Sequence, residues 1–155
     1  MIQDSSPKSV EMNPIGYVHR ASQDEDDRDR SLVSTVVVDK DLAPGLDGIE
    51  DWSHLYVIFW MDEVQQAEEP FLRHRGTGEG VFAARSPMHP NPIGLTLVEL
   101  VGREDNVLRV RGLDALDGTP VLDIKPYPDW NRGRLLVVTD FRIPGWLTRI
   151  IEQQK

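Results

Sequence analysis

Short runs of strand-forming residues, each closed by a turn former, dominate this sequence. The runs are rich in Val, Ile, Leu and aromatic side chains and stop at Gly, Pro, Asp or Asn, which is typical of β-strands joined by turns. Helical spacing is scarce between them, so a closed or nearly closed β-barrel is favoured over a Rossmann-type sheet. We therefore predict a mainly β, single-sheet closed barrel with short helical pieces. The predicted strands are residues 15–19, 32–39, 55–61, 81–84, 95–101, 107–111, 121–124 and 135–139.

Some of these segments carry a more specific prediction. Residues 95–101 and 107–111 alternate apolar and polar side chains around a short polar linker, which predicts a hairpin. Residues 55–61 are apolar throughout and predict a central strand that is covered on both faces. A short helical turn is expected around residues 68–75. Apolar residues at helical spacing predict a helix over 146–154.

Length and composition bound the domain organisation. The chain has 155 residues, which fits one domain, and 39% hydrophobic residues suffice for a core. We expect a flexible N-terminus over 1–12, a barrel domain over 13–140 and a helical tail over 141–155. Neither a signal peptide nor an apolar run of roughly 18 residues is present, so no membrane insertion is expected. The absence of cysteine suits a reducing compartment, and the expected location is the cytoplasm.

The charge balance limits the partners of the chain. A formal net charge of -9 argues against holding nucleic acid by backbone charge alone, because phosphate contacts normally come from clustered Lys and Arg. DNA is therefore not an expected partner, and any RNA contact must be local. Part of the excess lies in residues 24–30, which is typical of a solvated loop. Basic residues gather at 73–75 and at Arg103, Arg109 and Arg111, where a binding role and a solvated surface remain equally open.

Common nucleotide and metal motifs are missing from the sequence. No G-x-G-x-x-G follows a strand, there is no P-loop, and no pair of histidines has the spacing of a zinc site, so no metal is expected. The glycines of residues 76–80 predict a flexible loop, because they follow a polar basic stretch and not a strand. His54, at the head of an apolar strand, is predicted to be a structural histidine.

Two predicted loops carry the residues that are best suited to bind a ligand. Residues 85–94 hold three prolines and begin with Arg85, which predicts a stiff loop with available carbonyl groups. Such a loop suits a flat polar ligand with an anionic group, and it suits a barrel corner equally well. Residues 113–120 contain a strong Asp-Gly turn signal. That turn brings Asp114 and Asp117 close together, where both can accept hydrogen bonds from ribose hydroxyls or an amine.

A third group of polar residues alternates along a strand. Asp123, Lys125 and Tyr127 occupy every second position, so in an extended chain they point the same way. The spacing fits a functional set of acid, base and phenol, and it equally fits a salt-bridged surface row. Pro126 and Pro128 restrict this stretch to the edge or the end of a strand.

Four strings of the sequence together resemble a known family. NPIGYVH, LDGIEDWSHLYVIFW, GVFAARSPMHPNPIGLTLVEL and GLDALDGTPVLDIKPY are similar to the TsaA-like (TrmO) family of S-adenosylmethionine-binding proteins and tRNA methyltransferases. The resemblance covers residues 14–127, and its motifs are long and ordered. It implies a single-sheet β-barrel, a homodimer and S-adenosylmethionine as cofactor. It also implies methylation of N6-threonylcarbamoyladenosine at adenosine-37, in the anticodon loop of threonine tRNA.

The resemblance further implies the cofactor contacts. Arg85 matches the arginine of the family's A-T-R-S string, and Leu95 follows its N-P-I-G turn. Residues 113–116 match the cofactor loop before the family's D-G-T-P turn. The full implied set is Arg30, Asp62, Glu63, Arg85, Ser86, Asn91, Leu95, Leu113, Asp114, Ala115, Leu116 and Asp117.

Three parts of the sequence depart from the family pattern. Asp62-Glu63 stand where the bacterial enzymes usually carry His-Gln. The early Pro-Arg-Gln motif falls on residues 29–31, so only its arginine, Arg30, is kept. His89 stands where many members carry arginine.

The implied reaction indicates which further residues are needed. Methyl transfer from the cofactor is an in-line displacement, so alignment of the reactants is the main task. The N6 nitrogen of a threonylcarbamoylated adenosine is a weak nucleophile, and a group that accepts its proton would help. Our hypothesis is that Asp123 or Tyr127 acts as this catalytic base, with Lys125 and Arg85 handling anionic groups.

Recognition of an anticodon loop would require stacking on exposed bases, and aromatic side chains do this well. Trp52, Trp60 and Trp130 are candidates by residue type. Two alternatives remain open for the whole chain. One is a methyltransferase that acts on a small molecule or another RNA, and the other is a protein that binds S-adenosylmethionine without catalysis.

Overall fold

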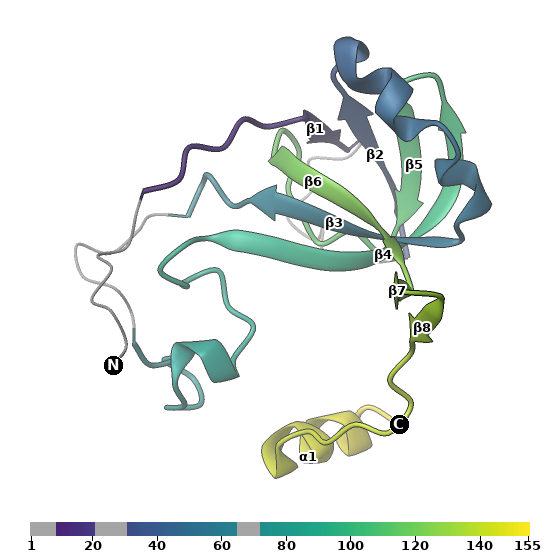
Figure 1. Cartoon of the computed structure of the whole chain (residues 1–155). Helices are drawn as coiled ribbons and strands as arrows, with labels where there is room; N and C mark the ends of the chain where they lie inside the picture. Colours follow the sequence, from purple (N-terminus) through teal and green to yellow (C-terminus); the bar gives the residue numbers. More distant parts are fainter. Residues whose placement is uncertain (1–8, 21–30, 65–71) are drawn as a thin grey trace, which may run out of the picture.

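A closed β-barrel forms the body of the protein. The computed structural model describes residues 9–20, 31–64 and 72–155. Within these residues, six strands close into an antiparallel barrel in the order β1-β2-β5-β4-β3-β6, and a separate two-stranded ribbon follows (Figure 1). The predicted mainly β, closed barrel is confirmed. The barrel strands are β1 (Gly16–His19), β2 (Val33–Val38), β3 (His54–Trp60), β4 (Ile93–Glu104), β5 (Val107–Arg111) and β6 (Pro120–Tyr127).

Alternation of side chains along these strands builds one core inside the barrel. Inward-facing aliphatic residues from five strands are shielded completely from water. Because each such residue contributes roughly 1.5–3 kcal/mol on burial, the core supplies the main stabilisation of the barrel. The residues with 0% exposure are Val18, Val36, Leu55, Val57, Leu108, Val110 and Val121.

A glycine and a bulge fix the geometry where β3, β4 and β6 meet. Gly94 lies opposite Phe59, and a Cβ atom at this position would overlap the Phe59 ring, so only glycine fits. On the other side of β3 the register shifts, because Ile58 pairs with Asp123 while Phe59 pairs with Val121. Such a bulge bends the strand and increases its twist, which helps a small sheet to close.

Most of the predicted strands are confirmed to within a few residues. The hairpin of β4 and β5 is confirmed as well, although β4 continues to Glu104 and takes up most of the expected linker. The reversal occurs at Asp105, whose φ of 51° places it in the left-handed region. Asn106 fixes the turn to the end of β2, since its side-chain amide donates a 2.5 Å hydrogen bond to the Val38 carbonyl.

The predicted environment of β3 is only partly confirmed. The strand is central, with β4 on one side and β6 on the other. The prediction that both faces of the strand are covered is wrong, because every second side chain is buried while those between are half-buried. In a closed barrel only the inward side chains reach the core, and the outward row remains in partial contact with water. The outward residues are His54, Tyr56, Ile58 and Trp60.

The prediction of a strand over residues 81–84 is wrong. This segment is the 3-10 helix η3 (Val81–Ala83), in which the Ala83 amide donates to the Gly80 carbonyl at 2.9 Å. Val81 is buried, whereas Phe82 is exposed, so the apolar run does not face a common core. Two further 3-10 helices, η1 (Lys40–Leu46) and η2 (Ile49–Asp51), were not predicted and connect β2 to β3.

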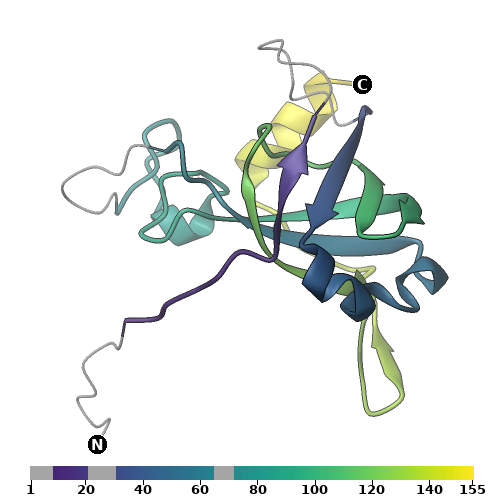
Figure 2. The same cartoon turned by 90° about the horizontal axis from the view of Figure 1, so that it is seen from above.

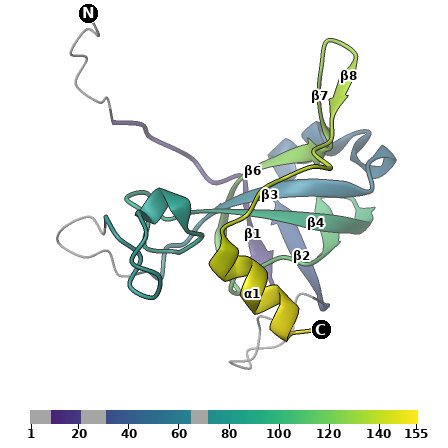
Figure 3. The same ribbon diagram turned by 90° about the horizontal axis from the view of Figure 1, so that it is seen from below.

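The predicted strand over residues 135–139 is shorter and earlier than expected. It is β8 (Arg134–Leu136), and it pairs with β7 (Asp129–Asn131), which the sequence pattern did not indicate. Arg132 and Gly133, both with positive φ, form the tight turn between them. All residues of both strands are exposed, and the ribbon projects from the barrel (Figures 2 and 3).

The predicted C-terminal helix is confirmed within one residue as α1 (Gly145–Gln153). The expected helical turn around residues 68–75 is not found in its described part, because Arg73 forms an isolated bridge with Gly80 instead. Residues 68–71 lie outside the described chain. Among the residues that the structure describes, no helix is both long and apolar enough to cross a membrane.

Candidate functional site

A pocket of about 390 Å³ lies at one end of the barrel. This volume falls within the roughly 300–1,000 Å³ that is usual for small-molecule sites. Five of the residues implied as cofactor contacts line it, namely Asp62, Glu63, Asp114, Ala115 and Leu116. The remaining lining residues are Arg20, Phe59, Met61, Val64, Pro87 and Thr119.

The acidic residues after β3 are placed in the pocket by a tight turn. The Met61 amide donates to the Pro92 carbonyl at 2.8 Å, which holds the chain beside the start of β4. The Asp62 amide then donates to the Trp60 carbonyl at 3.0 Å, and the backbone reverses. Asp62 and Glu63 therefore stand at the barrel end, where the sheet no longer pairs their backbone and their side chains remain available.

The loop between β5 and β6 supplies the opposite wall. Leu113 and Ala115 are buried and anchor the loop to the core, so Asp114 and Leu116 point outward between them. The loop then turns at Gly118, whose φ of 79° confirms the predicted Asp-Gly turn. Leu113 and Ala115 thus hold the loop in place, while the exposed Asp114 and Leu116 line the pocket.

Arg20 was missed by sequence reasoning and is the principal fixing point of this loop. It follows β1 directly, and only 6% of its surface is exposed. Its Nη1 donates to the Ala115 carbonyl at 2.9 Å, and its backbone amide donates to Asp117 Oδ1 at 2.8 Å. A buried guanidinium is tolerated only when it is hydrogen-bonded. No local pattern could reveal these contacts, because Arg20 lies 95 residues from Ala115 in the sequence.

The balance of charge in the pocket favours a cationic ligand. Asp62, Glu63 and Asp114 provide three carboxylates, while Arg20 provides one guanidinium. Phe59, whose ring is buried, adds an apolar surface beside them. An acidic pocket with an apolar wall can hold an organic cation that also carries a flat ring or hydroxyl groups.

The structure does not bring all implied contacts to this pocket. Arg85 Nη2 donates to the Leu95 carbonyl at 2.5 Å, so these two residues lie together on the outside of the barrel. Leu95 is opposite Ile58, and Ile58 is opposite Asp123, which places the three side chains on one outer face. Arg85 and Leu95 therefore do not line the pocket, and Leu95 lies on the same outer face as the predicted catalytic row.

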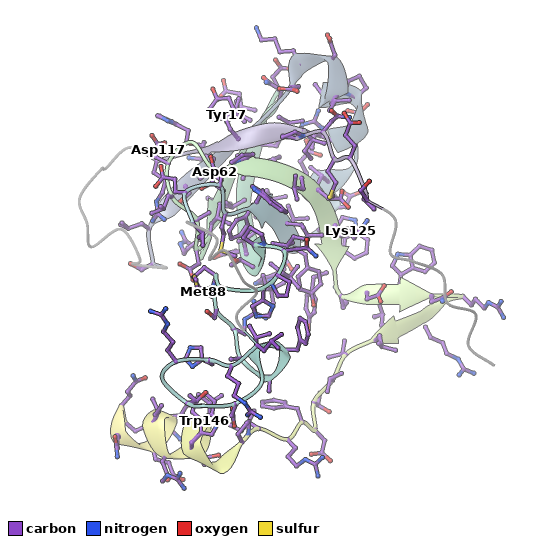
Figure 4. The ribbon with its side chains drawn as sticks, turned by 90° about the vertical axis from the view of Figure 1, so that its left-hand side faces the viewer. Tyr17, Asp62, Met88, Asp117, Lys125 and Trp146 are labelled. Atoms are coloured by element: carbon purple, nitrogen blue, oxygen red, sulfur yellow. The ribbon has the colours of Figure 1, made fainter. Side chains whose placement is uncertain are left out.

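The row of Asp123, Lys125 and Tyr127 is confirmed to face one side. Asp123 Oδ2 and Lys125 Nζ are 2.8 Å apart, and this hydrogen bond and charge raise the pKa of Lys125. The Tyr127 ring packs edge-on against Tyr56, with ring centroids 5.6 Å apart. In Figure 4, Lys125 lies well apart from Asp62 and Asp117. None of the three residues of the row lines the pocket, so the predicted base and the pocket are separate within one chain.

Other implied contacts have structural partners in the loops. Ser86 Oγ accepts a 3.1 Å hydrogen bond from the Met88 amide, which closes a local turn. Asp117 accepts from Arg20 and lies 3.4 Å from His19 Nδ1. Asn91 lines a separate outer groove beside Trp60, Leu113 is part of the core, and Arg30 lies outside the described residues.

Comparison with known proteins identifies the family of this barrel. The model of the tRNA-methyltransferase O N-terminal domain matches residues 23–130. The chain belongs to the TrmO family. The resemblance that the four sequence strings indicated is therefore confirmed.

Relatives within the TrmO family differ in length from this chain. An S-adenosyl-L-methionine-binding protein of Archaeoglobus fulgidus is 42% identical over 122 residues, covering 75% of this chain and 88% of the relative. The tRNA (adenine(37)-N6)-methyltransferase of Escherichia coli is 44% identical over 94 residues, which are 55% of this chain and 40% of that enzyme. The crystal structure of TrmO from Pseudomonas aeruginosa superposes with a TM-score of 0.70 at 29% identity, covering 91% of this chain and 63% of the other.

Proposed function

We propose that this chain is an S-adenosylmethionine-dependent methyltransferase whose cofactor occupies the pocket at the end of the barrel. The observation that carries this proposal is the convergence of Asp62, Glu63 and Asp114 around one space of about 390 Å³. When bound, the cofactor supplies an electrophilic methyl group on a positively charged sulfur. The acidic wall suits that charge and the cofactor's amino group, and the apolar Phe59 suits its adenine ring.

The protein's own contribution in this pocket is binding and orientation. Asp114 can accept hydrogen bonds from ribose hydroxyls, and the backbone of Ala115 and Leu116 can border the adenine ring. Arg20 fixes the loop before any ligand arrives, so little conformational entropy is lost on binding. In-line methyl transfer depends on such fixed alignment more than on acid-base groups.

We further propose adenosine-37 of threonine tRNA, in its threonylcarbamoylated form, as the methyl acceptor. The family description and the name of the E. coli relative support a tRNA substrate. Asp123 or Tyr127 remains our candidate for the base that accepts the N6 proton. Lys125 Nζ lies 2.8 Å from Asp123 Oδ2 and would hold that carboxylate in one orientation.

A homodimer is the third element of the proposal. Ile93, Leu95 and Leu97 each expose 43–44% of their surface along the outer face of β4. A contiguous apolar stripe of this kind commonly marks an interface. A second copy on this face would bring Asp123 and Lys125 of one subunit toward the other subunit. There they could approach the partner's cofactor pocket, although they do not line the pocket of their own chain.

A second candidate function is cofactor binding without methyl transfer. It is favoured by the A. fulgidus relative, whose name states binding alone and of which this chain covers 88%. The separation of the pocket from Asp123 within one chain is also compatible with it. A methyltransferase that uses a small molecule or another RNA would share the same pocket.

Calorimetry and nucleoside analysis test these proposals in sequence. Titration with S-adenosylmethionine should give saturable binding, and Asp114→Asn should weaken it about tenfold or more, equivalent to about 1.4 kcal/mol. Asp129→Asn, an exposed acid on the ribbon, serves as the matched control and should bind normally. Absence of binding by the unmodified protein contradicts the proposal.

The acceptor is identified by incubating the protein with methyl-labelled cofactor and total tRNA, followed by mass spectrometry of the nucleosides. Label in N6-methyl-N6-threonylcarbamoyladenosine supports the tRNA proposal. Normal cofactor binding without labelled RNA would favour the binding protein or a small-molecule acceptor.

A further inference from the structure

A basic surface adjoins the pocket in this otherwise acidic chain. We use the term basic lobe for residues 72–92 together with 141–155. These residues contain six Lys and Arg side chains and two carboxylates, whereas the whole chain has a formal net charge of -9. All six cationic residues are exposed. They are Arg73, Arg75, Arg85, Arg142, Arg149 and Lys155.

The two segments of the basic lobe form one surface. Trp146 Nε1 on α1 donates a 2.8 Å hydrogen bond to Glu79 Oε1 in the loop before η3. This contact joins residues that are 67 positions apart, and it engages one of the two carboxylates of the lobe. The α1 helix and the loop of residues 73–80 therefore lie side by side.

An exposed aromatic ring stands within the basic lobe. Phe82 is 79% exposed, although it belongs to a 3-10 helix and not to a loose terminus. The His89 ring packs edge-on against it, with centroids 5.8 Å apart, and His89 Nε2 lies 2.9 Å from the Ala84 carbonyl. One edge of Phe82 is thus supported while most of the ring is open to a ligand.

The basic lobe borders the entrance of the pocket. Pro87 lines the pocket and follows η3, the 3-10 helix that carries Phe82, by four residues. In Figure 4, Met88 lies between Asp62 of the pocket wall and Trp146 of α1. An RNA strand that presents its target base to a cofactor held in this pocket would therefore pass over residues 82–88.

We propose that the basic lobe binds the RNA strand that presents the target base. Phe82 stacks on a base adjacent to the target nucleotide, and Arg142 and Arg149 contact the flanking phosphates. Exposed aromatics and arginines are the groups that bind unpaired RNA bases and backbone. The inference rests on the proposed methyltransferase function and specifies which surface holds the substrate. Charge segregation restricts an anionic strand such as RNA to this lobe, because the remaining surface of the chain is acidic and would repel it.

The stacking role is tested with a labelled anticodon stem-loop and fluorescence anisotropy. Phe82→Leu keeps an apolar side chain but removes the planar ring, and it should weaken binding about tenfold. Phe82→Tyr keeps the ring and should bind like the unmodified protein. Equal affinity of Phe82→Leu and the unmodified protein would overturn the stacking role, since an apolar contact alone would then suffice.

The phosphate contacts are tested through the salt dependence of binding. The double variant Arg142→Gln/Arg149→Gln should reduce the slope of log affinity against log salt by about 0.7–0.9 for each arginine. Arg132→Gln/Arg134→Gln, on the ribbon, is the matched control and should leave the slope unchanged. An unchanged slope in the lobe variant would overturn the proposal, whether or not the ribbon control changes it.

Calorimetry with S-adenosylmethionine separates failure of this inference from failure of the proposed function. All three lobe variants should bind the cofactor with unchanged affinity, because none of the substituted side chains lines the pocket. If the unmodified protein binds cofactor but not the stem-loop, the RNA surface is wrong while the pocket proposal stands. A protein partner captured through the lobe, with RNA affinity unaffected by the variants, would likewise overturn it.

Discussion

The barrel and the basic lobe are built in different ways, although they belong to one chain. Within the barrel, residues such as Leu55 and Leu108 are completely buried, and every strand is paired on two sides. Within residues 72–92, all of which are described, only Val81 and Pro92 are buried, and α1 has no buried residue. The barrel is thus held by packing, whereas the lobe is held by individual hydrogen bonds.

Because of this difference, we expect the barrel to determine the stability of the protein and the basic lobe to determine ligand recognition. A substitution in the barrel core removes packing that all six strands share, so it should affect global unfolding. A substitution in the basic lobe should instead change local opening or ligand affinity, because few buried contacts connect it to the core. The pocket lies at the border and depends on both regions. Measurements on each region can therefore contradict or refine this division.

The largest effect is expected in the barrel core. Leu108→Ala leaves a cavity at a site with 0% exposure and should lower the free energy of unfolding by about 2–5 kcal/mol. Urea unfolding followed by tryptophan fluorescence measures this change. Leu135→Ala, at a ribbon site that is 65% exposed, should stay within about 0.5 kcal/mol of the unmodified protein. Equal losses would show that packing is not concentrated in the barrel.

An intermediate effect is expected at Arg20, where the barrel meets the pocket loop. Arg20→Met leaves the Ala115 carbonyl without its donor and should cost about 1–3 kcal/mol of stability. It should also weaken S-adenosylmethionine binding, because the loop loses its fixing point. Arg20→Lys should recover only part of either property, since an ammonium cannot reproduce the guanidinium fork. Normal cofactor affinity in Arg20→Met would remove Arg20 from the pocket's function.

A smaller and local effect is expected in the basic lobe. Trp146→Phe removes the hydrogen bond to Glu79 and should destabilise the contact by about 0.5–1.5 kcal/mol. Hydrogen exchange of residues 72–84 and of α1 should become faster, while exchange in β3 stays unchanged. A parallel loss of protection in β3 would mean that the lobe and the barrel unfold as one unit.

The smallest effect is expected from the exposed pair of Asp123 and Lys125. The pKa of Lys125 is raised above its ordinary value of 10.5 because Asp123 stabilises the protonated amine. Its stabilising contribution is therefore complete at neutral pH and is lost as pH rises through the raised pKa. Unfolding midpoints of Lys125→Met and the unmodified protein should differ slightly at pH 8 and converge above that pKa. A difference that persists at high pH would indicate a role other than charge pairing.

Prediction from sequence succeeded where the pattern is local and repetitive. Alternation identified the β4–β5 hairpin, and the Asp-Gly signal identified the turn at Gly118. It failed at residues 81–84, because a short apolar run looks the same in a strand and in a 3-10 helix. It also missed β7, whose three exposed residues carry no apolar alternation.

The residues of the candidate site also divide into those that sequence motifs indicated and those that only the structure shows. The resemblance to known motifs indicated Asp62, Glu63 and residues 113–117, and the structure brings most of them to one pocket. Arg20 could not be found this way, since its contacts join positions nearly a hundred residues apart. The separation of Asp123 from that pocket was equally hidden, because only the register of β3 with its neighbours decides it.

The sequence by itself determined the barrel class, the family and the acidic loop that borders the pocket. These follow from side-chain alternation, turn chemistry and ordered motifs, all of which operate over short stretches of chain. Tertiary structure alone decided that Arg20 fixes the loop, that α1 lies against the loop of Glu79, and that Asp123 does not line the pocket. The physical reason is that each of these depends on which distant segments pair when the sheet closes, and strand pairing is set by the packing of the whole core.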